Sequence, residues 1–127
     1  MEWVIERARR GGEELRIVDD QFMSPPTYTM DVARTLGKFL KLGPEFGVYH
    51  MVNEGFCSWY EFTKAIFEIL EWDVEVKPIK SSELNRLARR PGGFSALENA
   101  KIHDIGLKMP GWKEGGLREY LSEKDYF

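Results

Sequence analysis

Cysteine, long apolar runs and an excess of basic charge are all scarce in this sequence. Cys57 is the only cysteine among 127 residues, so no intrachain disulfide can form and a reducing compartment is expected. No apolar run approaches the roughly 20 residues that a membrane-spanning helix needs. The opening Met1-Glu2-Trp3 leads into a charged amphipathic segment and not into a signal peptide. We therefore expect a cytoplasmic protein with no membrane partner.

The charge balance argues against a nucleic-acid partner. The chain carries 18 Lys+Arg against 21 Asp+Glu, a formal net charge of −3. Its dense basic runs, at 7–10 and 89–90, both sit among acidic neighbours, whereas a nucleic-acid-binding domain usually shows a basic face. With 43% hydrophobic residues, a chain of this length can form one domain with a core of its own. We predict a single domain over residues 1–127.

The sequence also lacks the motifs of a self-sufficient catalytic site. It has no Gly-x-Gly-x-x-Gly after an opening strand and no P-loop, so we expect this chain to bind no dinucleotide cofactor of its own. His50 and His103 have no metal-ligand spacing to a cysteine or to each other, so no metal site is predicted. Cys57 precedes a predicted helix, where a thiolate would be favoured, but a small packing residue is the simpler interpretation.

The order of the predicted elements indicates an α/β fold. Apolar residues at helical spacing predict a first helix that ends at Gly11-Gly12, and strands then alternate with further helices. Thr29 or Asp31 is the predicted cap of the second helix, after a loop over 20–26. We expect a small sheet of about three or four strands with flanking helices. The predicted strands are Leu15–Val18, Gly47–Val52 and Val74–Ile79, and short helices are predicted at 81–87, 99–106 and after Trp112.

The stretch from Ser58 to Glu61 is the clearest local signal. Its Ser-Trp-Tyr-Glu sequence is a capping box, in which the Ser hydroxyl and the Glu carboxylate each satisfy a backbone amide at a helix start. The apolar residues behind it predict a helix of about four turns. Tyr60 and Lys64 on this helix have the Tyr-x-x-x-Lys spacing of short-chain reductases. Because no cofactor fingerprint precedes them, the packing interpretation is favoured.

Two segments are candidate binding elements. Arg89-Arg90 precedes a Pro-Gly-Gly loop, where guanidinium groups can clamp phosphate oxygens and glycine lets a ligand approach the backbone. A solvated pair of surface arginines is the alternative. Residues 21–31 combine two prolines, hydroxyl-bearing side chains and a tyrosine ahead of a helix start, which offers amides to an anionic or polyhydroxyl ligand. A rigid turn with a purely structural role is the alternative there.

Taken together, these segments resemble the carboxyl-terminal half of the dTDP-4-dehydrorhamnose reductases, a family of extended short-chain reductases. The resemblance covers about Trp3 to Leu121, and the order of the motifs is as specific as any one of them. The matching stretches are Val18-Asp19-Asp20-Gln21 with residues 24–33, Gly47 to Gly55, Cys57 to Phe62, Ala88-Arg89-Arg90-Pro91 with Ser95, Leu97, Asn99 and Lys101, and Met109-Pro110-Gly111-Trp112.

The resemblance implies a division of labour between two domains. In that family an amino-terminal Rossmann domain binds NADPH and holds the catalytic Thr/Ser, Tyr and Lys, and the carboxyl-terminal part grips the dTDP-sugar. The implied reaction is reduction of the C4 ketone of dTDP-4-dehydro-L-rhamnose to dTDP-L-rhamnose. Arg90, with Arg89 beside it, would face the nucleotide diphosphate. Gln21, Thr27 and Tyr28 would line the sugar side of the cleft.

The resemblance also implies what this chain does not supply. Residues 1–12 would be the tail of a helix linking to the missing Rossmann domain, which a partner would otherwise provide. NADPH, and the magnesium ion of some family members, would belong to the complete enzyme, so the chain would be inactive alone. Tyr60 and Lys64 would have no catalytic role, and Gly115-Gly116 departs from the helix formers usual in the last helix. An exposed docking face would favour a homo-oligomer.

Two alternatives remain open from the sequence. A reductase-like fold can serve as a non-catalytic regulatory module that binds a partner protein. The chain could also be the substrate domain of another sugar-nucleotide epimerase or dehydratase. The Asp-Gln and Ser-Pro-Pro-Thr-Tyr patterns favour the rhamnose branch.

Overall fold

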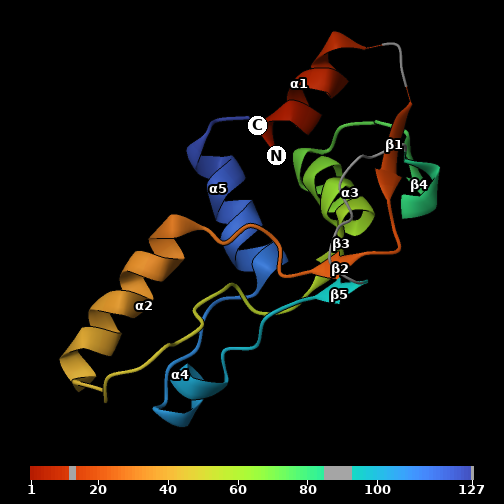
Figure 1. The fold of residues 1–127 in the computed structure, drawn as a ribbon. Helices are drawn as coiled ribbons and strands as arrows, with labels where there is room; N and C mark the ends of the chain where they lie inside the picture. The colour runs from red at the N-terminus through yellow and green to blue at the C-terminus, as the bar shows by residue number, and fades with distance from the viewer. Residues whose placement is uncertain (12–13, 85–92, 127) are drawn as a thin grey trace. The chain divides into compact units, whose positions relative to one another are not determined.

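The structure, a computed structural model, describes residues 1–11, 14–84 and 93–126 (Figure 1). It divides into two compact units, each made of two separate stretches of chain. The first unit combines Met1–Met23 with Cys57–Ser95, and the second combines Ser24–Phe56 with Ala96–Phe127.

The first unit is mixed α/β. Strands β1 and β4 pair in parallel, with Leu15 opposite Val76 and Val18 opposite Ile79. Three two-residue strands form a second small sheet in the order β3-β2-β5. The elements in chain order are α1 (Glu2–Arg10), β1 (Leu15–Val18), β2 (Phe22–Met23), β3 (Cys57–Ser58), α3 (Trp59–Leu70), β4 (Val76–Ile79), the 3-10 turn η1 (Ser81–Glu83) and β5 (Phe94–Ser95).

Helix α3 organises the core of this unit. Parallel strands need a long crossover connection, and α3 lies between β1 and β4 in the sequence and packs on both (Figure 1). Its apolar stripe is buried together with the inward side chains of the two strands. The buried apolar residues are Phe62, Ala65, Ile66, Phe67, Ile69 and Leu70 of α3 with Leu15, Val18 and Ile79 of the strands.

The predicted capping box at the start of α3 is confirmed. The Ser58 hydroxyl accepts a hydrogen bond from the Glu61 amide at 3.1 Å, and the Glu61 carboxylate accepts one from the Ser58 amide at 2.8 Å. The same hydroxyl donates to the Asp19 carboxylate at 2.9 Å, which ties the helix start to the end of β1. The helix has 12 residues, or about 3.3 turns, slightly fewer than the four turns expected.

The second unit is helical. Its buried apolar residues are Ile102, Met109, Leu117 and Leu121. Two contacts join its long helix α2 to α5. The Tyr28 hydroxyl donates to Glu123 at 2.6 Å, and Arg34 pairs with Glu119 at 2.8 Å, so α5 braces the start of α2. The elements are α2 (Thr29–Leu42), α4 (Ala100–Asp104), the π-helical turn η2 (Trp112–Leu117) and α5 (Arg118–Glu123).

The predicted strand Gly47–Val52 is not a strand in the structure. A side chain takes the place of a neighbouring strand there. The Asn99 amide accepts from the Val52 backbone N–H at 2.9 Å and donates to the Val52 carbonyl at 2.7 Å. This satisfies the backbone N–H and carbonyl of Val52 without a neighbouring strand, which apolar alternation in the sequence cannot reveal.

The start of α2 also differs from the prediction. Its N-cap is Tyr28, and the cap has no side-chain hydrogen bond, so neither Thr29 nor Asp31 is the cap. Asp31 is buried and binds elsewhere. The predicted loop over 20–26 contains β2, which is held between β3 and β5. The α/β prediction itself is confirmed, with the strands distributed over two small sheets.

Candidate functional site

The predicted sugar-side residues Thr27 and Tyr28 are fixed by Asn53. The Asn53 backbone N–H donates to the Thr27 hydroxyl at 3.3 Å. The Asn53 side-chain oxygen accepts from the Tyr28 backbone N–H at 2.9 Å. Both predicted residues are half-buried, so their side chains remain partly accessible at the start of α2. The structure therefore brings Thr27 and Tyr28 together on one braced turn.

The Tyr28 phenol is engaged by an acid. Its hydrogen bond to Glu123 raises the pKa of Tyr28 to about 12, with smaller contributions from burial and from the negative charges of Glu123 and Glu119. The Tyr120 ring packs edge-on against the Tyr28 ring at 6.3 Å. The phenol is therefore neutral at physiological pH, and because its one proton is donated to Glu123 it can accept a hydrogen bond from a ligand. It is suited to hydrogen bonding and unsuited to proton abstraction.

Gln21 follows β1 in the first unit. The two residues before it, Asp19 and Asp20, have carboxylates that both accept hydrogen bonds. Asp19 accepts from the Ser58 hydroxyl, and Asp20 accepts from the Ser81 amide at 3.0 Å and the Ser81 hydroxyl at 3.0 Å. Burial raises the pKa of Asp20, but these hydrogen bonds outweigh it and the net direction is downward. Hydrogen bonds thus hold both carboxylates in place after β1, and Gln21 is half-buried beside them.

The predicted diphosphate residues Arg89 and Arg90 lie outside the described residues. Gln21 belongs to the first unit, and Thr27 and Tyr28 belong to the second. The five predicted residues therefore stay a prediction as a set. The sequence did not point to Asn53 and Glu123, although both hold predicted residues. An Asn-Glu-Gly sequence is typical of a turn, and only burial distinguishes Asn53 from an ordinary turn residue.

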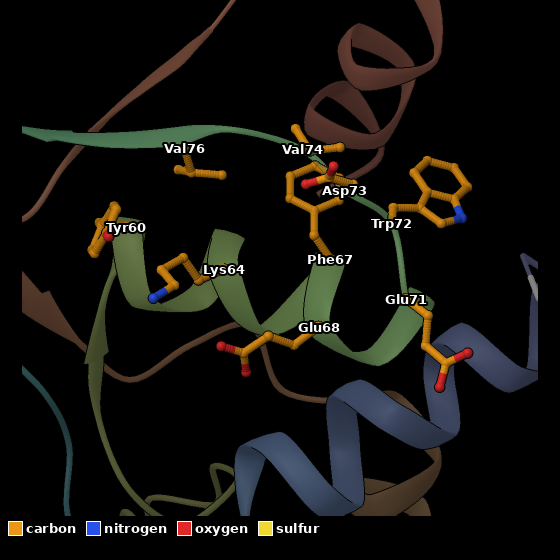
Figure 2. Close-up of a pocket in the computed structure, with 9 residues that line it drawn as sticks. All are labelled: Tyr60, Lys64, Phe67, Glu68, Glu71, Trp72, Asp73, Val74 and Val76. Atoms are coloured by element: carbon orange, nitrogen blue, oxygen red, sulfur yellow. The ribbon is translucent and has the colours of Figure 1, made fainter.

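A groove of about 530 Å³ lies in the first unit between α3 and the segment that leads to β4 (Figure 2). Val74 and Val76 form its upper wall. Figure 2 shows Glu68 and Glu71 pointing to different sides, so the acids do not converge on one point. The Lys64 ammonium lies 5.7 Å from the centre of the Tyr60 ring, which is a cation–π contact. Tyr60 and Lys64 thus pack against each other.

A second groove, of about 310 Å³, runs beside β1. It is largely apolar, and its walls come from α1, β1 and α3. The lining residues are Met1, Trp3, Val4, Arg16, Ile17, Val18, Trp59, Thr63 and Leu84. Trp3 is exposed although it is large and apolar. An apolar groove along a strand is a feature of interaction surfaces.

The two outer edges of the β1–β4 sheet are chemically different. The Leu15 and Asp19 amides donate to the Glu75 and Ile79 carbonyls of the β4 side. Because strands alternate with a period of two, the Arg16 and Val18 backbone groups face the other way. On β4 the same alternation turns Pro78 outward, and proline has no N–H to offer. The β4 edge is therefore blunted, whereas the β1 edge can accept a further strand.

Other residues with reactive side chains are committed to structure. Burial raises the pKa of the Cys57 thiol to about 12, with Glu61 adding to the shift, which supports the packing interpretation. His103 Nε2 lies 2.7 Å from Glu54 Oε1. In the described ranges no three His, Cys, Asp or Glu side chains gather in a metal-binding group. Within the same ranges, every helix is too short or too polar to cross a bilayer.

The fold is that of the substrate-binding part of an extended short-chain reductase, with a parallel βαβ unit and a mainly helical second unit. The chain belongs to the RmlD substrate binding domain family, whose family model matches residues 2–125.

Known proteins from several bacteria are similar to most of the chain. The spore coat polysaccharide biosynthesis protein SpsK of Bacillus subtilis is 39% identical over 112 residues, which cover 88% of this chain and 38% of SpsK. A probable dTDP-4,6-dihydroxy-2-methyloxan-3-one 4-ketoreductase of Streptomyces antibioticus is 31% identical over 118 residues, covering 91% of this chain and 39% of that protein.

A solved structure shows the same fold. The crystal structure of dTDP-4-dehydrorhamnose reductase from Bacillus anthracis in complex with NADP superimposes with a TM-score of 0.83 at 34% identity. The match covers 96% of this chain and 42% of that one. The chain therefore spans about two-fifths of the length of the relatives it matches.

Proposed function

We propose that this chain binds a dTDP-linked 4-keto sugar as the substrate-binding domain of a reductase. The family match over residues 2–125 carries the proposal, because it is a match to a substrate-binding domain. The relatives support the nucleotide part, since the Streptomyces antibioticus and Bacillus anthracis proteins are both named for dTDP-sugars. The sugar is dTDP-4-dehydro-L-rhamnose and the product dTDP-L-rhamnose.

Arg90 would bind the diphosphate with Arg89 beside it, and Gln21, Thr27 and Tyr28 would contact the sugar. A guanidinium binds phosphate oxygens through two parallel hydrogen bonds, which suits a diphosphate. The braced Thr27–Tyr28 turn supports the second assignment, because it offers a hydroxyl and a neutral phenol to a polyhydroxyl ligand.

NADPH would be held by another domain. In a dinucleotide fold the turn after the first strand is glycine-rich, so that the pyrophosphate can approach a helix start. In this chain the turn after β1 instead carries the two engaged carboxylates Asp19 and Asp20, which would repel a pyrophosphate. The residues present therefore do not fit the cofactor. We expect the chain alone to transfer no hydride, because that step requires the cofactor beside the ketone.

The β1 edge would receive the domain that holds NADPH. A two-stranded parallel sheet is incomplete by itself, since parallel strands are normally covered on both faces within larger sheets. The edge has outward backbone groups at Arg16 and Val18 and an apolar groove beside it. We assign it to a parallel edge strand of a Rossmann domain, whether that domain lies in the same protein or in a partner.

Proline at position 16 tests this assignment. Arg16→Pro removes an outward N–H, which the isolated sheet tolerates for the reason that β4 tolerates Pro78. It should abolish association with the separately produced part of the Bacillus anthracis reductase that this chain does not match, measured by calorimetry, while the circular dichroism stays unchanged. Arg16→Ala keeps the amide and should associate normally. Equal binding by both variants would contradict strand addition.

The nucleotide-binding proposal is tested by calorimetric titration of the chain with dTDP. We expect micromolar to millimolar affinity, and Arg90→Ala should abolish the heat. Arg10→Ala is the matched control, because Arg10 is an exposed arginine engaged only locally in an ion pair with Glu6. No heat from a folded sample would overturn binding by the isolated chain and would favour the regulatory interaction module instead. Titration with UDP and GDP tests the alternative of another sugar-nucleotide epimerase or dehydratase.

The relatives keep a second candidate sugar open. The Streptomyces antibioticus protein is named for a dTDP-sugar other than dehydrorhamnose and is 31% identical to this chain. Competition between dTDP-L-rhamnose and other dTDP-6-deoxyhexoses in the same titration decides between them. A preference for another sugar would correct the substrate and leave the nucleotide assignment in place.

A further inference from the structure

Asn53 is a buried polar residue, and both the nitrogen and the oxygen of its side-chain amide are hydrogen-bonded. Its exposed fraction is 0%. Its amide nitrogen donates to the Asp31 carboxylate at 2.8 Å and to the Pro110 carbonyl at 3.2 Å. Its amide oxygen accepts from the Tyr28 backbone N–H at 2.9 Å. One side chain therefore joins the start of α2 to the segment that precedes η2.

The Asn53 side chain and its partner Asp31 are tightly enclosed. Asp31 is 1% exposed, and its other oxygen lies 3.4 Å from an Arg34 guanidinium nitrogen. A buried carboxylate requires such partners, because an unpaired charge away from water is costly. Gly116 also lies so close to the amide that a β-carbon at that position would be 2.5 Å from the Asn53 oxygen. The Asn53 amide consequently has a single position and orientation.

The contacts converge on the two residues expected to meet the sugar. Asn53 binds the Thr27 hydroxyl through its backbone and the Tyr28 backbone through its side chain. Glu123 orients the Tyr28 ring from the other end. Fixing the backbone of the turn at Asn53 also fixes where the Thr27 hydroxyl and the Tyr28 ring are presented.

We propose that Asn53 is a positioning residue for the sugar: it holds the Thr27–Tyr28 turn in the geometry that reads the hexose and does not touch the ligand itself. This inference rests on the proposed function and deepens it. A loose turn would still let the nucleotide bind through the arginines. It would remove the additional affinity that the sugar provides, because ordering the turn would then oppose binding.

Asn99 supplies a matched control. It is also a buried asparagine, 1% exposed, and its amide makes equivalent hydrogen bonds to the Val52 backbone and to Glu54. Its removal should loosen the unit about as much as removal of Asn53. Within the described part of the chain, the Asn99 amide bonds Val52 and Glu54 and makes no hydrogen bond to Thr27 or Tyr28. The control therefore separates general loosening of the unit from loss of positioning.

The experiment compares the affinity for dTDP-L-rhamnose with that for dTDP in four proteins: the unaltered chain, Asn53→Ala, Gly116→Ala and Asn99→Ala. The measured quantity is the ratio of the two dissociation constants. We expect the sugar to improve binding in the unaltered chain, and Asn53→Ala to reduce this improvement about tenfold, the factor for one hydrogen bond. Affinity for dTDP itself should stay the same.

Gly116→Ala should act like Asn53→Ala, because its β-carbon displaces the Asn53 amide without altering Asn53. Asn99→Ala should keep the ratio of the unaltered chain. Two results would overturn the positioning role alone. One is that Asn53→Ala leaves the ratio of the two dissociation constants unchanged, and the other is that Asn99→Ala changes this ratio as much as Asn53→Ala does. If the unaltered chain does not distinguish the two ligands, the turn does not read the sugar and the inference fails. If it binds neither, the proposed function fails first.

Discussion

The α-carbon of Gly116 lies directly against the side-chain amide of Asn53. Gly116 is not in the left-handed region, so its backbone conformation is open to any residue. Space alone requires glycine there, because a β-carbon would lie 2.5 Å from the Asn53 oxygen. Gly115 is similar, with a β-carbon position 2.6 Å from that of Pro110. Two adjacent glycines are unfavourable in an ordinary helix. In η2 they are required, because there is no room for a β-carbon at either position.

Gly116→Ala should destabilise the chain by about 1–3 kcal/mol, the usual cost of overpacking a filled site. Gly37→Ala is the control. Gly37 lies in the middle of α2 with nothing within 4 Å of its β-carbon position, so alanine there should stabilise the helix by roughly 1 kcal/mol. The urea midpoints of the two variants should shift in opposite directions. A shift in the same direction would contradict the close approach of Gly116 and Asn53.

Ser58→Ala should cost about 1 kcal/mol or somewhat more. The substitution removes the N-cap hydrogen bond of α3. It also removes the buried Ser58 hydroxyl, which donates a hydrogen bond to the Asp19 carboxylate. Ser82→Ala changes an exposed serine of η1 and should stay within about 0.5 kcal/mol of the unaltered chain. Urea unfolding followed by circular dichroism measures both. Equal midpoints for the two variants would show that the cap contributes nothing.

Local sequence signals predicted the main helix and the β1 strand of the first unit, but not its two-residue strands. The capping box at Ser58, the apolar stripe of α3 and the strand at Leu15–Val18 each depend on neighbours in sequence, and each is confirmed. The missed features depend on distant residues. The segment Gly47–Val52 alternates like a strand, but a side-chain amide 47 positions away replaces the ladder at Val52. No periodicity in the segment itself contains that information.

The candidate site was predictable only in part, for the same reason. Thr27 and Tyr28 stand out because prolines and hydroxyl-bearing residues cluster before a helix. Asn53 does not, since an Asn-Glu-Gly sequence reads as an ordinary turn. Its role follows from burial and from contacts with residues 25, 26 and 57 positions away. Burial of a polar side chain is a tertiary property, so the sequence alone could not identify the residue that braces the turn.

Tyr28 should ionise only near pH 12. The hydrogen bond to Glu123 raises its pKa, so the folded state holds the phenolic proton more tightly than the unfolded chain, whose tyrosines ionise near pH 10. The resulting stabilisation is complete below pH 10 and is lost as the pH rises toward 12. Difference absorbance between the unaltered chain and Tyr28→Phe isolates this residue. Glu123→Gln should move its titration to lower pH, and an unmoved titration would contradict the contact.

Glu54 should contribute to stability above acid pH. Burial raises its pKa, but hydrogen bonds from Asn99 and His103 and the charge of His103 outweigh that effect, so the pKa lies below the ordinary value of 4.5. A carboxylate with a lowered pKa stabilises the fold above its unfolded pKa, and this contribution disappears as the pH falls through the folded value. Glu54→Gln should therefore be less stable at pH 7 and should lose less stability between pH 5 and pH 3.

The His103→Gln variant separates the two partners of Glu54. It removes the imidazole while the Asn99 hydrogen bond remains, so the acid-induced loss of stability should begin at a higher pH than in the unaltered chain. Urea midpoints at pH 7, 5, 4 and 3 measure all three proteins. Parallel curves for the unaltered chain and Glu54→Gln would mean that the carboxylate is not stabilised by folding. If the His103→Gln curve coincided with that of the unaltered chain while the Glu54→Gln curve differed, Asn99 alone would hold the Glu54 carboxylate.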